Sequence, residues 1–419
     1  MIPRHLLPLT LGEALTLALD SRPAPSVADV ENLYAQALRA TDVVVFPSGR
    51  AGIHVVLRAG CGLHAHVVCP AYTCAVVHQA VDLLRARTDY LDTDPDSFLM
   101  SAPDIAHALE PDSALILSEV YGIRYDRQSI DEACADGTHL RIFDLAMCVP
   151  SPERIGELGV KDVAIYSFGW GKPMYAGWGA IACFRNAELA GQVRLARDAW
   201  IGAAWKLSRG LHQTSVLMQI VMNERLPHGI SQSSLARSLL KVIRGWNRGH
   251  GGAGGFDNEA PGTPPVLPFR SVDEKSRFSV LPAEWTRPPG NLDRKLALRN
   301  LPHMSRHARL RLSQAESYFS LLVEPGTFRG PSRETLPQSH FPVRIAASAR
   351  NAFRRFLRHR GIDVSVLFPL PPQIERRSYP NAAAAADEVV TLPMGPSLTQ
   401  DEVRRIAACA QEAERARQH

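Results

Sequence analysis

Residues 162–184 read DVAIYSFGWGKPMYAGWGAIACF and carry the strongest structural signal in the chain. Two short apolar runs, at residues 162–168 and 179–184, have the length and composition of buried strands. Between them lie three glycines, two tryptophans and a single lysine, Lys172. A lysine amine is nucleophilic when it is desolvated at the end of a strand, whereas a lysine in a surface turn is only a charge. Both interpretations of Lys172 are open from this segment alone.

The same kind of apolar run recurs toward the N-terminus. Further strand-like runs lie at residues 42–46, 66–70, 88–94, 114–122 and 140–146. Helical patterns separate most of these runs, as is typical of βαβ units. The sequence therefore predicts an α/β fold with a mainly parallel sheet in its large domain.

The last third of the chain predicts a second, smaller α/β domain. We expect strands at residues 340–345, 363–369 and 388–393, a helix at 350–361, and a closing helix capped by Ser397 or Thr399. We assign residues 1–285 to the large domain and 286–419 to the small C-terminal domain.

The region between the two domains is different in composition. Residues 190–245 look helical, and residues 248–268 hold six glycines and four prolines. Such a segment is either a surface loop or a mobile lid over the site.

Composition argues against several classes of protein. A net charge of +5 over 419 residues is a small excess, and the arginine clusters have the spacing of solvated helix faces, so we expect no nucleic-acid binding. No long apolar run predicts a membrane span, and the first residues lack the basic region of a signal peptide. Seven cysteines without a CxxC spacing are typical of reduced thiols in a cytoplasmic protein.

Polar residues follow the predicted strands, at the edge of the sheet where α/β proteins bind ligands. Asp144 in FDLA is a lone carboxylate after an apolar strand, and it needs a partner because burying it alone is costly. A protonated pyridine nitrogen of pyridoxal phosphate (PLP) is one such partner; a helix cap or an ion pair is the alternative. Ser48 and Gly49, before a helical pattern, can present N–H groups to a phosphate, to which Arg50 would add charge and Ser167 a hydroxyl.

Several segments of the chain, in the same order, resemble those of one enzyme family. FPSGRAGIHVVLRA (46–59) is similar to SGTAALHLAL, DYLDTDPDSFLM (89–100) to VFVDIDPDTFNL, RIFDLAM (141–147) to VIEDAAQ, and YSFGWGKPMYAGWGA (166–180) to FSFYPGKNLGAYGGGA. These are segments of the DegT-type aminotransferases, fold type I PLP enzymes that mostly aminate keto-sugars carried on nucleotides. The resemblance covers roughly residues 42–190 and 340–410.

The resemblance implies roles for individual residues. Lys172 would be the Schiff-base lysine and proton carrier, and Asp144 would pair with the pyridine nitrogen. The implied cofactor-binding set is Ser48, Gly49, Arg50, Tyr72, Cys74, Asp144, Ala146, Ser167 and Lys172. Cys74 stands where the family's PxYTF block has an aromatic residue, so either its thiol lies on the ring face or Tyr72 substitutes. The resemblance also implies a homodimer with residues of both chains near each cofactor.

Two departures from the family pattern leave the keto substrate open. Met147 replaces the glutamine of EDAAQ, and no segment matches the family's GYNYRM block, in whose place residues 190–290 stand. We expect a cytoplasmic, homodimeric PLP-dependent aminotransferase that transfers an amino group, from glutamate, to a keto-sugar or related keto substrate. The alternatives are a PLP enzyme of another reaction type, such as elimination, replacement or carbon–carbon bond chemistry, and a non-catalytic PLP-binding relative. Lys172 argues against the dehydratase variant of the family, which carries histidine there.

Overall fold

The computed structural model describes residues 1–63, 65–135, 137–200, 216–221, 223–224 and 288–418. The glycine- and proline-rich segment at residues 248–268 and the expected domain boundary at 285/286 lie outside these ranges, as does most of the helical prediction for residues 190–245. The lid and the two-domain division therefore stay predictions. No helix among the described residues is both long enough and apolar enough to span a bilayer.

In the described part of the chain, seven strands form one sheet in the order β1–β7–β6–β5–β4–β2–β3. They are β1 Asp42–Phe46, β2 His66–Pro70, β3 Arg87–Leu91, β4 Ala114–Ser118, β5 Leu140–Asp144, β6 Asp162–Ser167 and β7 Ala180–Phe184. β7 is antiparallel to both of its neighbours, β1 and β6, and the remaining pairs are parallel. The predicted α/β fold with a mainly parallel sheet is confirmed.

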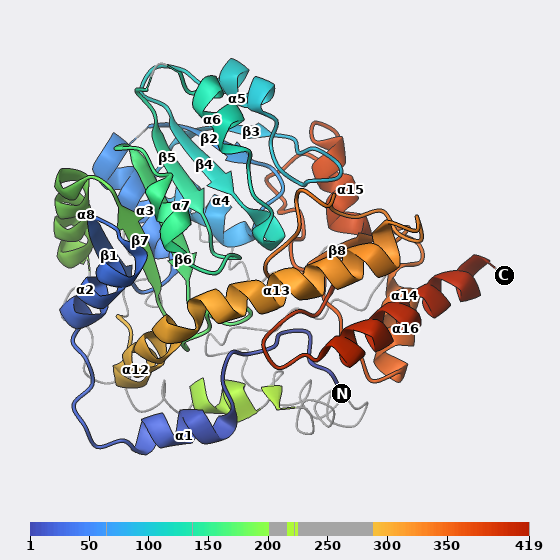
Figure 1. The fold of residues 1–419 in the computed structure, drawn as a ribbon. Helices are drawn as coiled ribbons and strands as arrows, with labels where there is room; N and C mark the ends of the chain where they lie inside the picture. The colour runs from blue at the N-terminus through green and yellow to red at the C-terminus, as the bar shows by residue number, and fades with distance from the viewer. Residues whose placement is uncertain (64, 136, 201–215, 222, 225–287, 419) are drawn as a thin grey trace, which may run out of the picture.

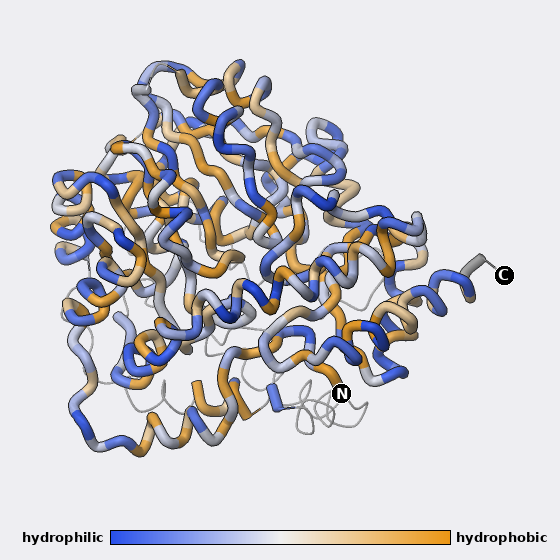
Figure 2. The backbone as a smooth tube through the Cα atoms, viewed as in Figure 1, coloured by the Kyte–Doolittle hydropathy of each residue, from blue (hydrophilic) through white to orange (hydrophobic). Residues whose placement is uncertain are grey.

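Alternating residues of each strand supply two apolar layers, because successive side chains of a strand point to opposite faces. In β1, Val44 and Phe46 pack in one cluster, and Val43 and Val45 pack in the other. The first cluster is covered by α3 (Gly49–Cys61), α4 (Ala75–Asp82) and α8 (Ala187–Trp200). The second is covered by α2 (Val27–Leu38), α5 (Ala102–Ala108), α6 (Arg127–Ala133) and α7 (Pro152–Gly156). Figure 2 shows hydrophobic residues concentrated along the central strands.

The C-terminal part has its own apolar core beside the sheet (Figure 1). Its elements are α12 Asn291–Asn300, α13 Met304–Tyr318, β8 Phe341–Arg344, α14 Arg350–His359, α15 Pro380–Glu388, β9 Val389–Leu392 and α16 Gln400–Gln418. β8 and β9 form an antiparallel pair. The Thr399 hydroxyl accepts a hydrogen bond from the Glu402 N–H at 3.2 Å, which confirms Thr399 as the cap of α16.

The strand predicted at residues 363–369 is wrong. In its place the structure has one isolated bridge between Ser365 and Thr391 of β9. The segment runs into Pro369, Pro371 and Pro372, which have no N–H to donate to a neighbouring strand. Apolar content alone therefore over-predicted strand here.

The N-terminal segment, residues 2–9, lies against the C-terminal core before it reaches the large sheet. The Ile2 N–H donates to the Gly361 carbonyl at 2.8 Å, and the Asp363 N–H donates to the Ile2 carbonyl at 2.9 Å. Ile2 and Leu6 are buried in the C-terminal core. Helix α1 (Leu11–Leu19) follows this segment.

Candidate active site

The connection between β6 and β7 presents Lys172 at the carboxyl end of the sheet. Two hydrogen bonds close its base, from the Phe168 N–H to the Gly179 carbonyl and from the Ala176 N–H to the Phe168 carbonyl, both at 2.9 Å. Lys172 is half-buried, and its Nζ donates to the Met147 Sδ at 3.4 Å. A thioether is a weak acceptor, so this contact orients the amine without neutralising it.

Asp144 ends β5 and is almost completely buried, with 8% of its surface exposed. Its carboxylate accepts hydrogen bonds from the Ser118 hydroxyl at 3.3 Å and the Ala146 N–H at 3.1 Å. Within the described ranges, no lysine, arginine or histidine forms an ion pair with it. Burial raises the pKa of Asp144, and the nearby positive charge of Lys172 opposes that rise. A buried carboxylate with neutral donors has the chemistry to receive a cationic ligand.

The N-terminus of α3 lies at the same edge of the sheet. Ser48 caps the helix, accepting a hydrogen bond from the Ala51 N–H at 3.3 Å. A methyl group added at Gly49 would lie 3.6 Å from the Ser167 Cβ, so Gly49 faces Ser167 directly. The first-turn N–H groups of a helix, together with two hydroxyls, are a suitable site for a phosphate. The Arg50 guanidinium donates to the Gln79 Oε1 of α4 at 3.3 Å.

Tyr72 and Cys74, which follow β2, occupy different environments. Tyr72 is buried, its hydroxyl is 2.5 Å from the Tyr121 hydroxyl, and its ring packs near Phe98 and Phe368. Cys74 is half-buried at the N-cap of α4. The Cys74 side chain is therefore the more accessible of the two.

A strained turn after β4 joins the two parts of the molecule, and sequence reasoning missed it. Tyr121 and Gly122 have φ values of 60° and 80°. The Tyr121 carbonyl accepts hydrogen bonds from the N–H groups of Gln338 and Ser339 at 3.0 and 2.9 Å, and the Gln338 side chain accepts one from the Val149 N–H at 3.1 Å. The chain just before β8 is thereby held against the Met147 side of the site.

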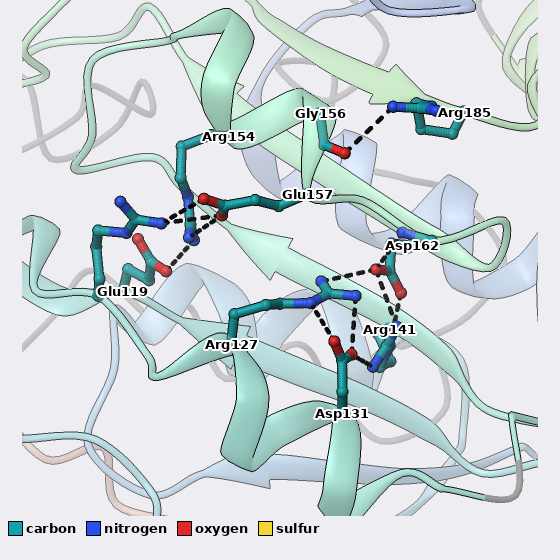
Figure 3. A network of polar contacts seen from close by, with 11 residues as sticks. Glu119, Arg127, Asp131, Arg141, Arg154, Gly156, Glu157, Asp162 and Arg185 are labelled. Carbon is teal, nitrogen blue, oxygen red and sulfur yellow. Dashed lines mark hydrogen bonds and ion pairs between the residues drawn. The ribbon is translucent and has the colours of Figure 1, made fainter.

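A buried ion pair lies directly behind Asp144, and it too was missed. The Glu119 N–H donates to the Asp144 carbonyl at 3.1 Å, and the Glu119 side chain pairs with Arg154 of α7 (Figure 3). The Cys148 thiol donates to the second Glu119 oxygen at 3.4 Å. Burial raises the pKa of Glu119, and the Arg154 charge counteracts the rise. The sequence signal was present, since Glu119, like Asp144, is a carboxylate at the end of an apolar strand.

Comparison with known proteins identifies related sequences and folds. The sequence model of the DegT/DnrJ/EryC1/StrS aminotransferase family matches residues 14–228 and 291–411, most of the chain. Solved structures with a similar fold include the sugar aminotransferase CalS13 from Micromonospora echinospora, with a TM-score of 0.66, 19% identity, and coverage of 98% of this chain and 100% of that one.

Two further similar structures extend the comparison. The putative sugar aminotransferase Spr1654 from Streptococcus pneumoniae, in its PMP form, has a TM-score of 0.66 and 16% identity, covering 99% of this chain and 100% of that one. The 3-amino-5-hydroxybenzoic acid synthase has the same TM-score of 0.66 and 16% identity, covering 99% of each chain. These likenesses concern the fold.

Proposed function

The chain belongs to the DegT/DnrJ/EryC1/StrS aminotransferase family of PLP-dependent enzymes, and we propose that it transfers an amino group from glutamate to a keto sugar. The observation that carries the proposal is the placement of half-buried Lys172 beside the buried carboxylate of Asp144. An amine next to an acceptor for a protonated pyridine nitrogen is the pair that amino transfer with PLP requires.

The residues at the sheet edge fit the cofactor. Ser48, Gly49 and Ser167, at the N-terminus of α3, would hold its phosphate, with Arg50 adding positive charge nearby. Asp144 would accept a charge-assisted hydrogen bond from the pyridine nitrogen. PLP, when bound, supplies an electron-withdrawing ring.

The remaining residues of the set act around the amine. Lys172 Nζ would attach the cofactor. Once released by the amino donor, the same amine would carry the proton that amino transfer moves from a carbon of the donor to a carbon of the cofactor. The Ala146 N–H fixes the Asp144 carboxylate through its 3.1 Å hydrogen bond. Cys74, half-buried at the start of α4, would lie on the ring face in place of the family's aromatic residue, because Tyr72 is enclosed by other aromatic side chains.

The substrate class rests on the family and on what the similar proteins are named for. Two of them are described as sugar aminotransferases, and a third as a synthase of an aminohydroxybenzoic acid. Met147, 3.4 Å from Lys172 Nζ, makes the site less polar than the family's glutamine would. That contact favours, as a second candidate, a less hydroxylated keto substrate in another biosynthetic reaction. We also propose that the protein is a cytoplasmic homodimer. Light scattering of the purified protein tests the dimer.

Absorbance spectroscopy tests the proposed function. Wild-type protein loaded with PLP should trap the cofactor on the chain after borohydride treatment, and L-glutamate should convert the PLP band into a pyridoxamine-type band. Lys172→Ala should trap none. Lys161→Ala is the matched control and should behave like wild type, because Lys161 is exposed and, among the described residues, its amine donates to the Thr138 carbonyl.

Two results would contradict the proposal. Trapping on Lys172→Ala would mean that another lysine attaches the cofactor. An unchanged spectrum with glutamate and with other amino donors would exclude amino transfer.

A further inference from the structure

The imidazole of His5 lies against the loop that carries Lys172. Its ring makes an edge contact with Trp170, at 5.9 Å between ring centroids. Gly171, between Trp170 and Lys172, has φ +76°, and a methyl group there would lie 3.1 Å from the His5 ring. The N-terminal segment and the lysine loop are thus in close contact one residue before Lys172.

His5 is itself anchored to His340, the residue that precedes β8. The His5 Nδ1 is 3.1 Å from the His340 Nε2, and the same Nε2 is 3.2 Å from the Arg4 carbonyl. A carbonyl can only accept, so His340 carries its proton on Nε2 and shares it between the Arg4 oxygen and the His5 Nδ1. It follows that the His5 Nδ1 is an acceptor.

The surroundings favour this neutral arrangement. His340 is 3% exposed, and burial lowers its pKa well below the ordinary value. His5 and the charges of Arg311 and Lys172 lower this pKa further, whereas the hydrogen bond to the Arg4 carbonyl raises it. Arg4 is itself paired with Asp363 at 2.7 Å. The His340 Nδ1, unprotonated, has no hydrogen-bond partner among the described residues.

The N-terminal segment that carries His5 is also fixed by contacts with the C-terminal core. Ile2 pairs with the chain at Ile362, and Leu6 packs so closely on Gly395 that a methyl group there would lie 2.5 Å from the Leu6 Cβ. His5 therefore lies between Ile2 and Leu6, which are both fixed by contacts with the C-terminal core. Its ring has little freedom to move away from the loop that carries Lys172.

We propose that His5 is a positioning residue for Lys172: held by the shared proton of His340, its ring fixes the Trp170–Gly171 backbone and so the place of the lysine amine. This inference rests on the proposed function, in which Lys172 attaches PLP. Sequence alone gave no sign of it, since 335 positions separate the two histidines.

The test separates attachment by Lys172 from binding of the cofactor's phosphate and ring. The rate of covalent attachment of PLP to apoprotein is measured by borohydride quenching and mass spectrometry. The affinity for pyridoxamine phosphate, which cannot form the link to lysine, is measured in parallel. The variants are His5→Phe, which keeps a ring without the Nδ1 acceptor, His340→Phe, which removes the Nε2 donor, and His340→Gln, whose side-chain amide N–H groups can replace that donor while the His5 ring stays intact.

We expect His340→Gln to stay within about twofold of wild type, because it keeps both the His5 ring and a donor to it, and His5→Phe to slow attachment about fivefold or more, with pyridoxamine phosphate affinity unchanged in both. His340→Phe should slow attachment about as much as His5→Phe. The double variant His5→Phe/His340→Phe should attach PLP no more slowly than the slower single variant, because both substitutions remove the same hydrogen bond.

Other outcomes overturn the inference. Attachment at the wild-type rate in His5→Phe, or equal losses in His340→Phe and His340→Gln, would show that the hydrogen bond between the two histidines is not used. A parallel loss of pyridoxamine phosphate affinity would show a general structural role. If wild-type protein does not attach PLP at Lys172 at all, the proposed function fails instead, so the two failures are distinguishable. If His5→Phe does not fold, the comparison of His340→Gln with His340→Phe gives the same decision.

Discussion

Asp144 is a buried carboxylate whose hydrogen-bond donors, the Ser118 hydroxyl and the Ala146 N–H, are both neutral. Burial raises its pKa, and the nearby charge of Lys172 and these two hydrogen bonds offset only part of that rise. Such a group costs stability in the free protein and is useful only when a cationic ligand faces it. The free energy of unfolding and the activity should therefore respond in opposite directions to loss of this charge.

Asp144→Asn tests that opposition. A hydrogen bond to a charged group contributes about 1.5–3 kcal/mol, so turnover should fall about 10- to 100-fold. The free energy of unfolding of the apoprotein should stay the same or rise, because no charge is buried. Single-turnover kinetics and urea denaturation measure the two effects, and Ser118→Ala, which removes only a neutral donor, is the control with the smaller kinetic loss. Normal turnover in Asp144→Asn would exclude the assigned role.

Among the connecting elements, the turn at Tyr121–Gly122 depends on glycine. A methyl group at Gly122 would lie 2.7 Å from the Met147 carbonyl oxygen and 2.8 Å from the Gln338 Cβ, on backbone with φ +80°. Gly326 has a similar φ, +75°, and nothing within 4 Å of the added methyl. The two glycines therefore separate backbone strain from steric contact.

Gly122→Ala should lower the free energy of unfolding by about 2–4 kcal/mol, since strain and contact add. Gly326→Ala should cost only about 1 kcal/mol, the strain of backbone with positive φ. Urea denaturation of both variants measures the difference. Equal costs would mean that the chain before β8 moves away from the turn without penalty.

A second feature at the scale of elements is the buried carboxylate that joins α6, β5 and β6. Asp162 at the start of β6 is fully buried and pairs with Arg127 at 2.8 Å and Arg141 at 2.6 Å; Asp131 also binds both arginines (Figure 3). Removing the buried charge would leave two partly buried guanidinium groups with Asp131 as their carboxylate partner among the described residues.

Asp162→Asn should destabilise the protein by about 3–5 kcal/mol, the usual cost of breaking a buried pair from one side. Asp401→Asn removes one partner of the exposed pair with Arg404 and should change the free energy of unfolding by less than about 0.5 kcal/mol. Thermal and urea unfolding compare the two. A small effect at Asp162 would show that the arginines find other acceptors.

For the whole molecule, buried histidines make the fold sensitive to acid. Burial lowers the pKa of His54, His78 and His307 from 6.5 to about 4, and it also lowers the pKa of His340 well below its ordinary value. Between the lowered value and 6.5 the unfolded chain binds more protons than the folded one, so stability rises with pH in that window and is lost as pH falls below 6.5. The raised pKa values of Glu119 and Asp144 act in the opposite direction and offset part of the loss.

The free energy of unfolding should therefore decrease from pH 7.5 to pH 5.0, by about 2 kcal/mol for each fully buried histidine such as His78. His78→Phe, which keeps a ring against Tyr90, should make the decrease about 2 kcal/mol smaller. His107→Gln on the exposed face of α5 should leave it unchanged. Urea midpoints at the two pH values provide the measurement, and an identical decrease in His78→Phe and wild type would contradict the assignment.

The sequence by itself determined the α/β class, the positions of the strands and the presence of Lys172, Asp144 and Ser167 at their carboxyl ends. These features depend on residues that are adjacent in the sequence, because a short apolar run encodes a strand. The carboxyl ends of parallel strands then lie at one edge of the sheet, independently of the helices that pack on it. Local signals also limited the cap of the closing helix to Ser397 or Thr399, of which the structure selects Thr399. They failed at residues 363–369, where the apolar run lacked a partner strand along its length.

Only the tertiary structure decided which distant residues meet around that edge. It made β7 antiparallel, joined Glu119 to Arg154, placed Gln338 on the Tyr121 turn and brought His5 to His340 behind the lysine loop. None of these contacts is visible in a local pattern, because each depends on how separate helices and strands fill one shared volume. Sequence spacing fixes the chemistry at the end of each strand, and packing fixes the neighbours that orient it.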